Sequence, residues 1–344
     1  MEASVTVIGA ANMDINGFSA APVNMGDSNP GRIEYCPGGV GRNIAENLHR
    51  LGTEVRLISV IGSDPGGQMI RAASEKLGLD IGHSLFLSGE VSSVYLAIMD
   101  SNGEMKLALA DMSLPERMTA EHLESKAALI AGSAVVALDA NLTEDIIRFV
   151  LDRFGPGQNP GGDGAGALPG AAGETRGGRN GGGPLFFLDP VSARKAVRAK
   201  GVIGGFDTLK LNRMEGECLS GIPLPSPETS GSGELGDSLD RAGSYFIDRG
   251  VRRVFITLGR TGVYFCSGGN RFFMASRQVK PVNTSGGGDA FMAGMIYGTL
   301  RGLSDEETAA FAGAMAAITV QSAGAVSPGM SLELVEEFLA KERL

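Results

Sequence analysis

Three consecutive glycines, Gly286, Gly287 and Gly288, stand directly before Asp289 in the stretch NTSGGGDAFMAGMIYGTL. The apolar run that follows predicts a helix, so the glycines would lie at its N-terminus. Backbone N–H groups of consecutive glycines can converge on one anion, and the helix dipole favours negative charge at that end. The stretch therefore predicts a site for a phosphoryl group, with Asp289 beside it as a general base.

A second candidate pair, Asn212 and Glu215, lies at the predicted start of another helix. Residues three apart share one face of a helix. The pair could hold magnesium through water, because Mg²⁺ usually keeps several waters and takes few protein ligands. A polar pair on the surface is the simpler interpretation of these two residues taken alone.

Polar residues also follow most of the predicted strands, at the edge where open α/β sheets bind their ligands. They are Asn12 and Asp14, Asp139 and Asn141, Asp189, Asn212 and Glu215, and Thr257 and Gly259. Any one of them could serve only as a helix cap or a turn residue. Their joint occurrence favours a polar site along one edge of the sheet.

The elements that would position these residues alternate between short β-branched runs and helical patterns. The runs begin near residues 5, 55, 134, 185, 208 and 254. This alternation predicts a mostly parallel sheet covered by helices on both faces. Ser304 and Glu307 have the spacing of a capping box, which predicts a helix from there to Val320.

Two regions depart from this alternation. Residues 91–111 alternate in period two around Asn102-Gly103, a dipeptide favoured in type I′ hairpin turns, and residues 15–37 are also strand-like, so the two stretches predict a small antiparallel flap. Residues 155–184 are rich in Gly and Pro and have almost no bulky apolar side chain. We expect them to be a disordered insertion inside one domain that spans residues 1–344.

Composition excludes several classes of partner. The 344 residues are 43% hydrophobic and carry a net charge of −9 without a basic run, which argues against nucleic acid. No apolar segment reaches the roughly 18 residues of a membrane span. Three scattered cysteines, Cys36, Cys218 and Cys266, make neither a disulfide framework nor a zinc site. We expect a globular cytoplasmic protein.

Other catalytic motifs are missing. The sequence has no GxxxxGK[ST] loop, and GVGRNI lacks the third glycine of a dinucleotide-binding fingerprint. The histidines His49, His83 and His122 lack the spacing of metal ligands. A P-loop kinase is therefore excluded, and oxidoreductase and metallohydrolase functions lose support.

The stretches GGVGRNIAENLHRLG and NTSGGGDAFMAG resemble the two signatures of the ribokinase-like (PfkB) sugar and nucleoside kinases. The signatures stand in the family's order, and the resemblance covers nearly the whole chain outside residues 155–184. It implies a three-layer α/β/α fold with a mostly parallel central sheet and a small antiparallel β lid. It also implies transfer of the γ-phosphoryl group of ATP, with Mg²⁺, to a hydroxyl of a small-molecule acceptor.

Within this family, the chain most resembles the kinases that act on pseudouridine. The similar stretches are VIGAANMDINGFS, DSNPGRIEYCPGGVGRNIAENL, LDPVSARK and LKLNRMEGECLSGI. They imply phosphorylation of the 5′-hydroxyl of pseudouridine to give pseudouridine 5′-phosphate. Ribose, a purine nucleoside and fructose remain alternative acceptors. A non-catalytic sugar-binding regulator is an alternative of another class, against which the intact Asp289 and Asn212-x-x-Glu215 pattern argue.

The resemblance also implies a role for each matching residue. Asp289 would be the base, and Gly286, Gly287 and Gly288 the anion hole. The ribose hydroxyls would contact Asn12, Asp14, Gly39 and Asn43. The nucleotide would contact Asn212, Thr257, Gly259 and Thr284, and Glu215 with Asn212 would hold magnesium through water. The lid would contribute to a homodimer.

Three departures from the family pattern carry information. Asn283 replaces the acidic residue that usually begins the second signature, which leaves a monovalent-cation site uncertain. Val40 stands where ribokinases tend to carry Lys, which argues against free ribose as the acceptor. Gly287 replaces a common Ala and leaves the backbone donors of the cradle intact.

Overall fold

The computed structural model describes residues 3–155, 183–229 and 232–341. The insertion expected at residues 155–184 lies outside the described residues except for Gly155, Gly183 and Pro184. Within the described ranges, no helix is long and apolar enough to cross a membrane.

The core of the molecule is an eight-stranded sheet in the order β14-β13-β12-β11-β10-β9-β1-β4. Its six neighbouring parallel strands are the apolar runs that the sequence predicted: β1 (Val5–Ile8), β4 (Val55–Ile58), β9 (Val135–Asp139), β10 (Leu185–Asp189), β11 (Thr208–Asn212) and β12 (Arg253–Thr257). Two antiparallel strands that were not predicted, β13 (Gly262–Ser267) and β14 (Arg271–Ala275), complete one edge.

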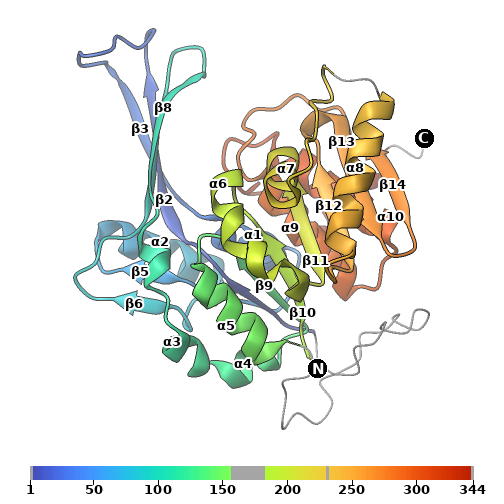
Figure 1. The fold of residues 1–344 in the computed structure, drawn as a ribbon. Coiled ribbons are helices and arrows are strands. Elements are labelled where there is room, and N and C mark those ends of the chain that lie inside the picture. The colour runs from blue at the N-terminus through green and yellow to red at the C-terminus, as the bar shows by residue number, and fades with distance from the viewer. Residues whose placement is uncertain (1–2, 156–182, 230–231, 342–344) are drawn as a thin grey trace.

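Helices cover both faces of this sheet (Figure 1), as the predicted fold class requires. Alternate strand residues enter two separate cores, so that Phe187 lies in one and Leu188 in the other. The first core includes α1 (Val40–Arg50), α2 (Pro65–Leu77), α9 (Gly287–Leu300), α10 (Asp305–Thr319) and α11 (Leu332–Ala340). The second includes α3 (Ala120–Glu124), α4 (Ala127–Ala131), α5 (Glu144–Phe154), α6 (Ala193–Ala196), α7 (Arg213–Ser220) and α8 (Ser232–Ile247). Short 3₁₀ helices lie at η1 (Leu114–Arg117), η2 (Val197–Gly205) and η3 (Gly259–Thr261).

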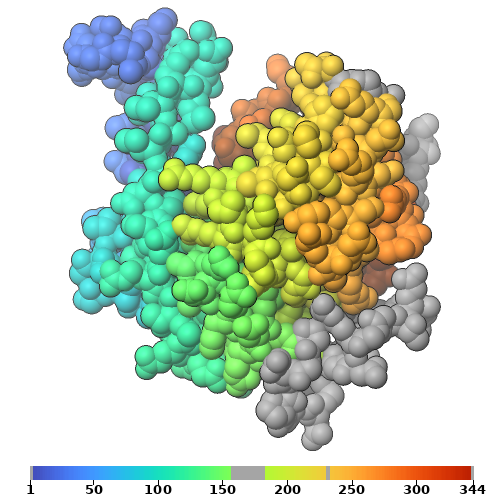
Figure 2. Space-filling view, viewed as in Figure 1, coloured from blue at the N-terminus to red at the C-terminus, as the bar shows by residue number. Residues whose placement is uncertain are grey.

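A second, smaller sheet projects from the body, and Figure 2 shows an open gap between the two. Its strands are β2 (Asn12–Ser19), β3 (Gly31–Gly38), β7 (Val94–Met99) and β8 (Met105–Asp111), in the order β3-β2-β7-β8. The pair β7–β8 is the hairpin predicted around Asn102-Gly103, and the predicted strand-like region before α1 forms the antiparallel pair β2–β3. A parallel β2–β7 pairing joins the two pairs. A two-stranded parallel sheet, β5 (Val60–Gly62) with β6 (Leu85–Leu87), lies nearby.

The turn between β7 and β8 differs from the predicted type I′. That type needs positive φ at both central residues, whereas at this turn only Gly103 has it, with φ +80°. The side chain of Asp100 explains the difference, because its Oδ1 accepts hydrogen bonds from the backbone N–H groups of Asn102 and Glu104. The carboxylate organises the turn, and Asn102 keeps a negative φ.

Helix α9, which begins at the glycine cradle, is buried along nearly its whole length. Helix α10 packs on it so closely that a Cβ on Gly294 would lie 2.5 Å from Cα of Ala312. The capping box predicted for α10 is present, since Ser304 and Glu307 each accept a hydrogen bond from the other's backbone N–H. Burial on all sides fixes the position of Asp289 in the first turn of α9.

We predict that Gly294→Ala lowers the free energy of unfolding by about 1–3 kcal/mol, because the added methyl group forces the two helices apart. Gly313→Ala on α10 is the matched control. No atom outside its own helix lies within 4 Å of the added Cβ, so stability should rise by about 0.5–1 kcal/mol. Urea denaturation measures both values, and equal effects of the two substitutions would contradict this account of the packing.

Candidate active site

The start of α1 approaches the end of β1 through glycine backbone. Gly39 has φ +103°, and a Cβ there would lie 2.5 Å from the carbonyl oxygen of Ala10. Only glycine fits both conditions. The first turn of α1 therefore lies against the strand end, and Asn43 at the start of this helix is buried. Gly39 thus acts through its backbone, which is compatible with the predicted contact to a sugar hydroxyl.

Asn43 and Asp289 meet although they are distant in the sequence. Nδ2 of Asn43 donates a hydrogen bond of 2.8 Å to Oδ2 of Asp289. The other end of the amide, Oδ1 of Asn43, is buried and has no hydrogen-bond partner among the described residues. A buried acceptor without a donor is costly, so this atom is suited to a hydroxyl of a bound molecule. The structure thus joins a predicted sugar-binding residue to the predicted base.

Burial sets the protonation of Asp289. Desolvation, followed by the nearby carboxylate of Asp189, raises its pKa to about 7, against the lowering effects of Lys210 and of the hydrogen bond from Asn43. Asp139 makes a smaller contribution to the rise. A carboxylate with this pKa can accept a proton near neutral pH, which is the property a general base needs.

The glycine cradle lies directly beside this carboxylate. Gly286 has φ +76°, and a Cβ on it would lie 1.8 Å from the carbonyl oxygen of Ala325, so only glycine fits. No side chain caps the N-terminus of α9. The first N–H groups of the helix, at Gly287 and Gly288, therefore suit an anion, which the helix dipole would also favour.

Asn12 and Asp14 lie at the base of the small sheet, on β2. Nδ2 of Asn12 donates a hydrogen bond of 2.6 Å to Oδ1 of Asp14. Burial raises the pKa of Asp14, while Asn12 and the guanidinium of Arg42 counteract that rise. A Cβ on Gly38 would lie 2.3 Å from Oδ2 of Asp14, so the carboxylate packs against bare backbone. Asp14 retains acceptor capacity for the hydroxyls of a sugar.

Asn212 and Glu215 form a capping box and not an isolated surface pair. Oδ1 of Asn212 accepts from the N–H of Glu215, and the two oxygens of Glu215 accept from the N–H and the Nδ2 of Asn212 at 2.7 Å each. Glu215 is buried, which raises its pKa. Within the part of the chain that the structure describes, no three His, Cys, Asp or Glu side chains cluster as metal ligands. Both carboxylate oxygens of Glu215 already accept hydrogen bonds from Asn212, an arrangement that is compatible with the predicted contact to a cation through water.

The positions predicted for the nucleotide lie along the adjoining edge. Thr257 of β12 is the register partner of Asn212, and its Oγ1 donates to the carbonyl of Leu211. Gly259 has φ +58° and open space around it. Thr284 is exposed in the loop before α9. Thr257 and Gly259 lie at and just after the end of β12, beside Asn212 at the end of β11, which is compatible with one ligand along this edge.

Asn283 anchors the loop that precedes the glycine cradle. Its Nδ2 donates to the carbonyl of Ala323, and its Oδ1 accepts from the N–H of Ser285. An amide meets both needs with its two ends, whereas a carboxylate could not donate. The amide therefore explains the structural role of this residue without a cation.

Two functional candidates escaped the sequence analysis or received no role there. Lys210 is buried in β11, and its Nζ lies 2.8 Å from Oδ2 of Asp189. The signal was available, because a lysine inside the apolar run TLKLN is unusual for a strand buried on both faces. Asp189 was identified only as a polar residue at a strand end.

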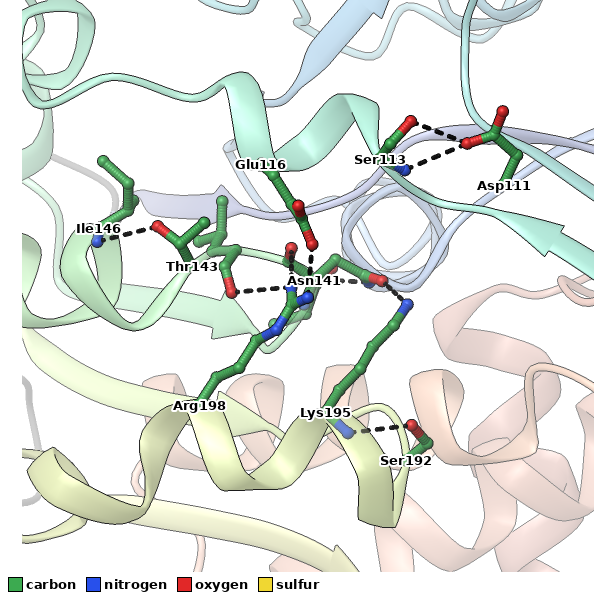
Figure 3. A network of polar contacts seen from close by, with 11 residues as sticks. Asp111, Ser113, Glu116, Asn141, Thr143, Ile146, Ser192, Lys195 and Arg198 are labelled. Carbon is green, nitrogen blue, oxygen red and sulfur yellow. Dashed lines mark hydrogen bonds and ion pairs between the residues drawn. The ribbon is translucent and has the colours of Figure 1, made fainter.

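A polar network borders the site where β9 ends. Figure 3 shows Lys195 and Arg198 pointing toward Asn141, whose Oδ1 accepts from Nζ of Lys195 and whose carbonyl accepts from Arg198. Arg198 also pairs with Glu116 of η1, just after the last strand of the small sheet. Burial lowers the pKa of Lys195. The sequence predicted Asn141 at this edge but not its cationic partners.

The chain is similar to known proteins along most of its length. The pfkB family of carbohydrate kinases matches residues 2–152 and 179–331. Pseudouridine kinase of Escherichia coli (strain K12) is 32% identical over 329 residues, which cover 95% of this chain and 94% of that protein. A carbohydrate kinase from Agrobacterium tumefaciens is similar in structure, with a TM-score of 0.76 and 26% identity over 99% of this chain and 97% of the other. The ribokinase of Thermotoga maritima shares the fold, with a TM-score of 0.77 and 21% identity over 98% and 99% of the two chains. The chain belongs to the pfkB family of carbohydrate kinases.

Proposed function

We propose that this protein phosphorylates the 5′-hydroxyl of pseudouridine with ATP as the donor, in the cytoplasm. The observation that carries the proposal is the buried Asp289, held by Asn43 beside the uncapped glycine start of α9. The similarity to Pseudouridine kinase of Escherichia coli along almost the whole chain supports the choice of acceptor. A phosphotransferase with a hydroxyl acceptor needs these parts, namely a base and an anion-binding cradle.

The acceptor's ribose would lie between the small sheet and α1. Asp14 would accept hydrogen bonds from ribose hydroxyls, and Asn12 would keep its carboxylate in place. The buried Oδ1 of Asn43 would accept another, and the backbone of Gly39 would complete the contacts. These contacts would hold the 5′-hydroxyl near Asp289.

Asp289 would then accept the proton of that hydroxyl as the oxygen attacks. The N–H groups of Gly286, Gly287 and Gly288 would stabilise the negative charge on the transferred group. Asn43 would keep the carboxylate oriented through the 2.8 Å hydrogen bond. The chain supplies position and charge stabilisation, and little covalent chemistry is required of it.

ATP would supply the phosphoryl group, and a magnesium ion bound with it would neutralise part of the negative charge of the phosphates. The nucleotide would contact Asn212, Thr257, Gly259 and Thr284. The water molecules around the magnesium ion would be ordered by Glu215 and Asn212. A requirement for a monovalent cation has weak support, because Asn283 replaces a carboxylate and both ends of its amide already have partners.

The small sheet would act as the lid of this site. Its strand β2 carries Asp14, and Figure 2 shows an open gap between the projecting sheet and the body. Closure over a bound acceptor would exclude water and suppress hydrolysis of ATP.

We predict that the protein consumes ATP fastest, by kcat/KM, with pseudouridine among pseudouridine, uridine, adenosine, ribose and fructose. Asp289→Asn should reduce turnover by about 100- to 10,000-fold, because the base is lost, while ATP still binds. A coupled assay of ADP formation and calorimetric titration with ATP measure the two effects.

Each other outcome of that assay has a distinct meaning. Preference for another sugar or nucleoside would discard pseudouridine and keep the chemistry. ATP binding without turnover on any acceptor would favour the sugar-binding regulator. Turnover that survives Asp289→Asn would show that another group is the base.

We also predict that Asp289→Asn stabilises the fold at alkaline pH. The pKa of Asp289 is raised to about 7 in the folded state, so the folded protein binds more protons than the unfolded chain between about pH 4 and that value. Its contribution to stability therefore falls as pH rises through this window and is constant above it. Asparagine does not ionise, so the variant does not lose this stability as the pH rises. The free energy of unfolding of the variant minus that of the parent should therefore increase by about 2–3 kcal/mol from about pH 5 to about pH 8.

Urea denaturation at the two pH values measures this gain. Asp152→Asn, at an exposed position on α5, is the matched control, and its difference from the parent should be the same at both pH values. A constant gain for Asp289→Asn would show that the carboxyl group is not held in the proposed environment.

We further propose that the small sheet joins two copies of this chain. One of its faces carries Asp14, whereas the opposite face carries Ile15, Tyr35, Leu96 and Leu109 in cross-strand register. Ile33 and Leu107 extend that face, and the four outer side chains Ile33, Tyr35, Leu107 and Leu109 are 63%, 57%, 49% and 60% exposed. A continuous face of apolar and aromatic side chains of this kind favours contact with the same face of a second copy.

We predict that Leu109→Lys shifts the protein from dimer to monomer, because a charge would be buried in the contact. Phe273→Lys on β14 is the control, since Phe273 is 50% exposed on a different sheet. Sedimentation velocity measures the mass of each. A monomeric parent, or a dimer that tolerates Leu109→Lys, would contradict the assembly.

A further inference from the structure

Three charged side chains form a row across the central sheet, beneath the first turn of α9. Asp139 and Asp189 are register partners on β9 and β10. On β11, Lys210 follows Leu209, which pairs with Leu188, so Lys210 takes the next place in the same row. Strand residues two positions earlier, Ala137 and Phe187, belong to the apolar core that includes α9. The row therefore faces α9, on the side where Asp289 lies.

Lys210 is the one cation of this row, and it is in contact with the glycine cradle. Its Nζ lies 2.8 Å from Oδ2 of Asp189 and 2.9 Å from where a Cβ on Gly288 would be. Both members of the ion pair are buried, with side chains 7% and 1% exposed. A side chain larger than hydrogen at Gly288 would displace the ammonium group. Backbone donors of the cradle and the buried cation thus lie on the same side of the site.

A buried ion pair inside a parallel sheet needs a reason, because apolar residues of the same size usually stabilise as well or better. Burial opposes the charge of Lys210, but the carboxylates of Asp189, Glu215 and Asp289 outweigh burial and raise the pKa of Lys210. The ammonium group therefore stays charged. It is placed to influence groups that titrate near neutral pH.

Four groups act on Asp289 from the elements packed around it. They are Asp189 on β10, Asp139 on β9, Lys210 on β11 and Asn43 on α1. The two carboxylates favour its protonated form, whereas the ammonium group and the amide favour its ionised form. The ion pair therefore contains one group that raises the pKa of Asp289, namely Asp189, and one that lowers it, namely Lys210.

We propose that Lys210 and Asp189 are a positioning pair that sets the proton affinity of Asp289 and supports the cradle at Gly288. Lys210 favours the ionised form of Asp289, which can accept a proton, and Asp189 holds Lys210 in place through the 2.8 Å contact. In this proposal the pair acts on Asp289 through charge and is not itself a catalytic group. The role of the pair in turnover rests on the proposed kinase function, but its effect on Asp289 does not.

The two members of the pair should shift the titration of Asp289 in opposite directions. Lys210→Met removes a cation and should raise the pKa of Asp289 by about one unit or more. Asp189→Asn removes an anion and should lower it by a similar amount. If the pair were purely structural, both substitutions would destabilise the protein, and they would not shift the pKa of Asp289 in opposite directions.

The test measures Asp289 directly and then through activity. Carbon-13 NMR of protein labelled at the aspartate carboxyl carbons follows the titration, with the Asp289 signal identified by its loss in Asp289→Asn. The pH profile of kcat/KM for pseudouridine is then measured on the parent and the variants. Its acid limb should shift to higher pH in Lys210→Met and to lower pH in Asp189→Asn. KM for ATP should change less than kcat.

A double variant keeps the test valid where Lys210→Met fails to fold because Asp189 is left buried without its partner. Lys210→Met combined with Asp189→Asn carries no unpaired charge, and its Asp289 should titrate higher than in Asp189→Asn alone. Equal values in these two proteins, or shifts of the same sign in the single variants, would overturn the proposal. Opposed NMR shifts without turnover on any acceptor would uphold the pair and reject the kinase function.

Discussion

The hydrogen bond from Asn43 to Asp289 joins two parts of the chain that are 246 residues apart, and the site depends on it. It forms only if α1 reaches the end of β1 and α9 starts directly above the sheet. The glycine backbone at Gly39 permits the first condition, and burial of α9 on all sides enforces the second. The bond therefore holds Asn43 and the start of α1 beside the glycine cradle.

The same closeness puts an excess of negative charge into a poorly solvated space. Four buried acidic side chains lie at or near the edge of the sheet where the parallel strands end, namely Asp139, Asp189, Asp289 and Glu215. The buried cation among them is Lys210. Such a cluster cannot stay fully ionised, because burial penalises every unpaired charge. Burial first, and then the carboxylates of Asp189 and Asp139, raise the pKa of Asp289 to about 7 against the opposing effect of Lys210. An environment that is costly for folding thus produces a carboxyl group suited to proton transfer at neutral pH.

The sequence predicted the six parallel strands because each is a short apolar run buried on both faces, a pattern that few other elements share. It did not identify β13 and β14, since GVYFCS and RFFMA form an antiparallel edge outside the repeating strand and helix units. The type I′ turn was wrong because the Asp100 side chain, and not the Asn-Gly dipeptide, organises the turn.

The candidate site was predictable where glycines and acidic residues stand together, and not where a contact arises only in three dimensions. Asp289 and its glycines are adjacent in sequence, so their chemistry could be inferred. The pair of Lys210 and Asp189 depends on strand register, which sequence patterns do not specify. Asn212 and Glu215 were identified as a pair, but their spacing also fits a capping box, and the structure is needed to show that their polar atoms bind each other.

The small sheet has two chemically different faces because a strand alternates its side chains, and this alternation links the acceptor site to assembly. Asp14 faces the site and is neighboured across the strands by Cys36 and Tyr95, whereas Ile15 next to it faces outward. A shift of β2 by one residue would exchange these faces and remove the carboxylate from the site. The apolar face that includes Ile15 and Tyr35 opposes such a shift if it is covered by a second copy, since polar side chains would then enter an apolar contact. Assembly through that face would therefore stabilise the register that keeps Asp14 on the opposite face of the sheet, where we propose that it contacts the acceptor.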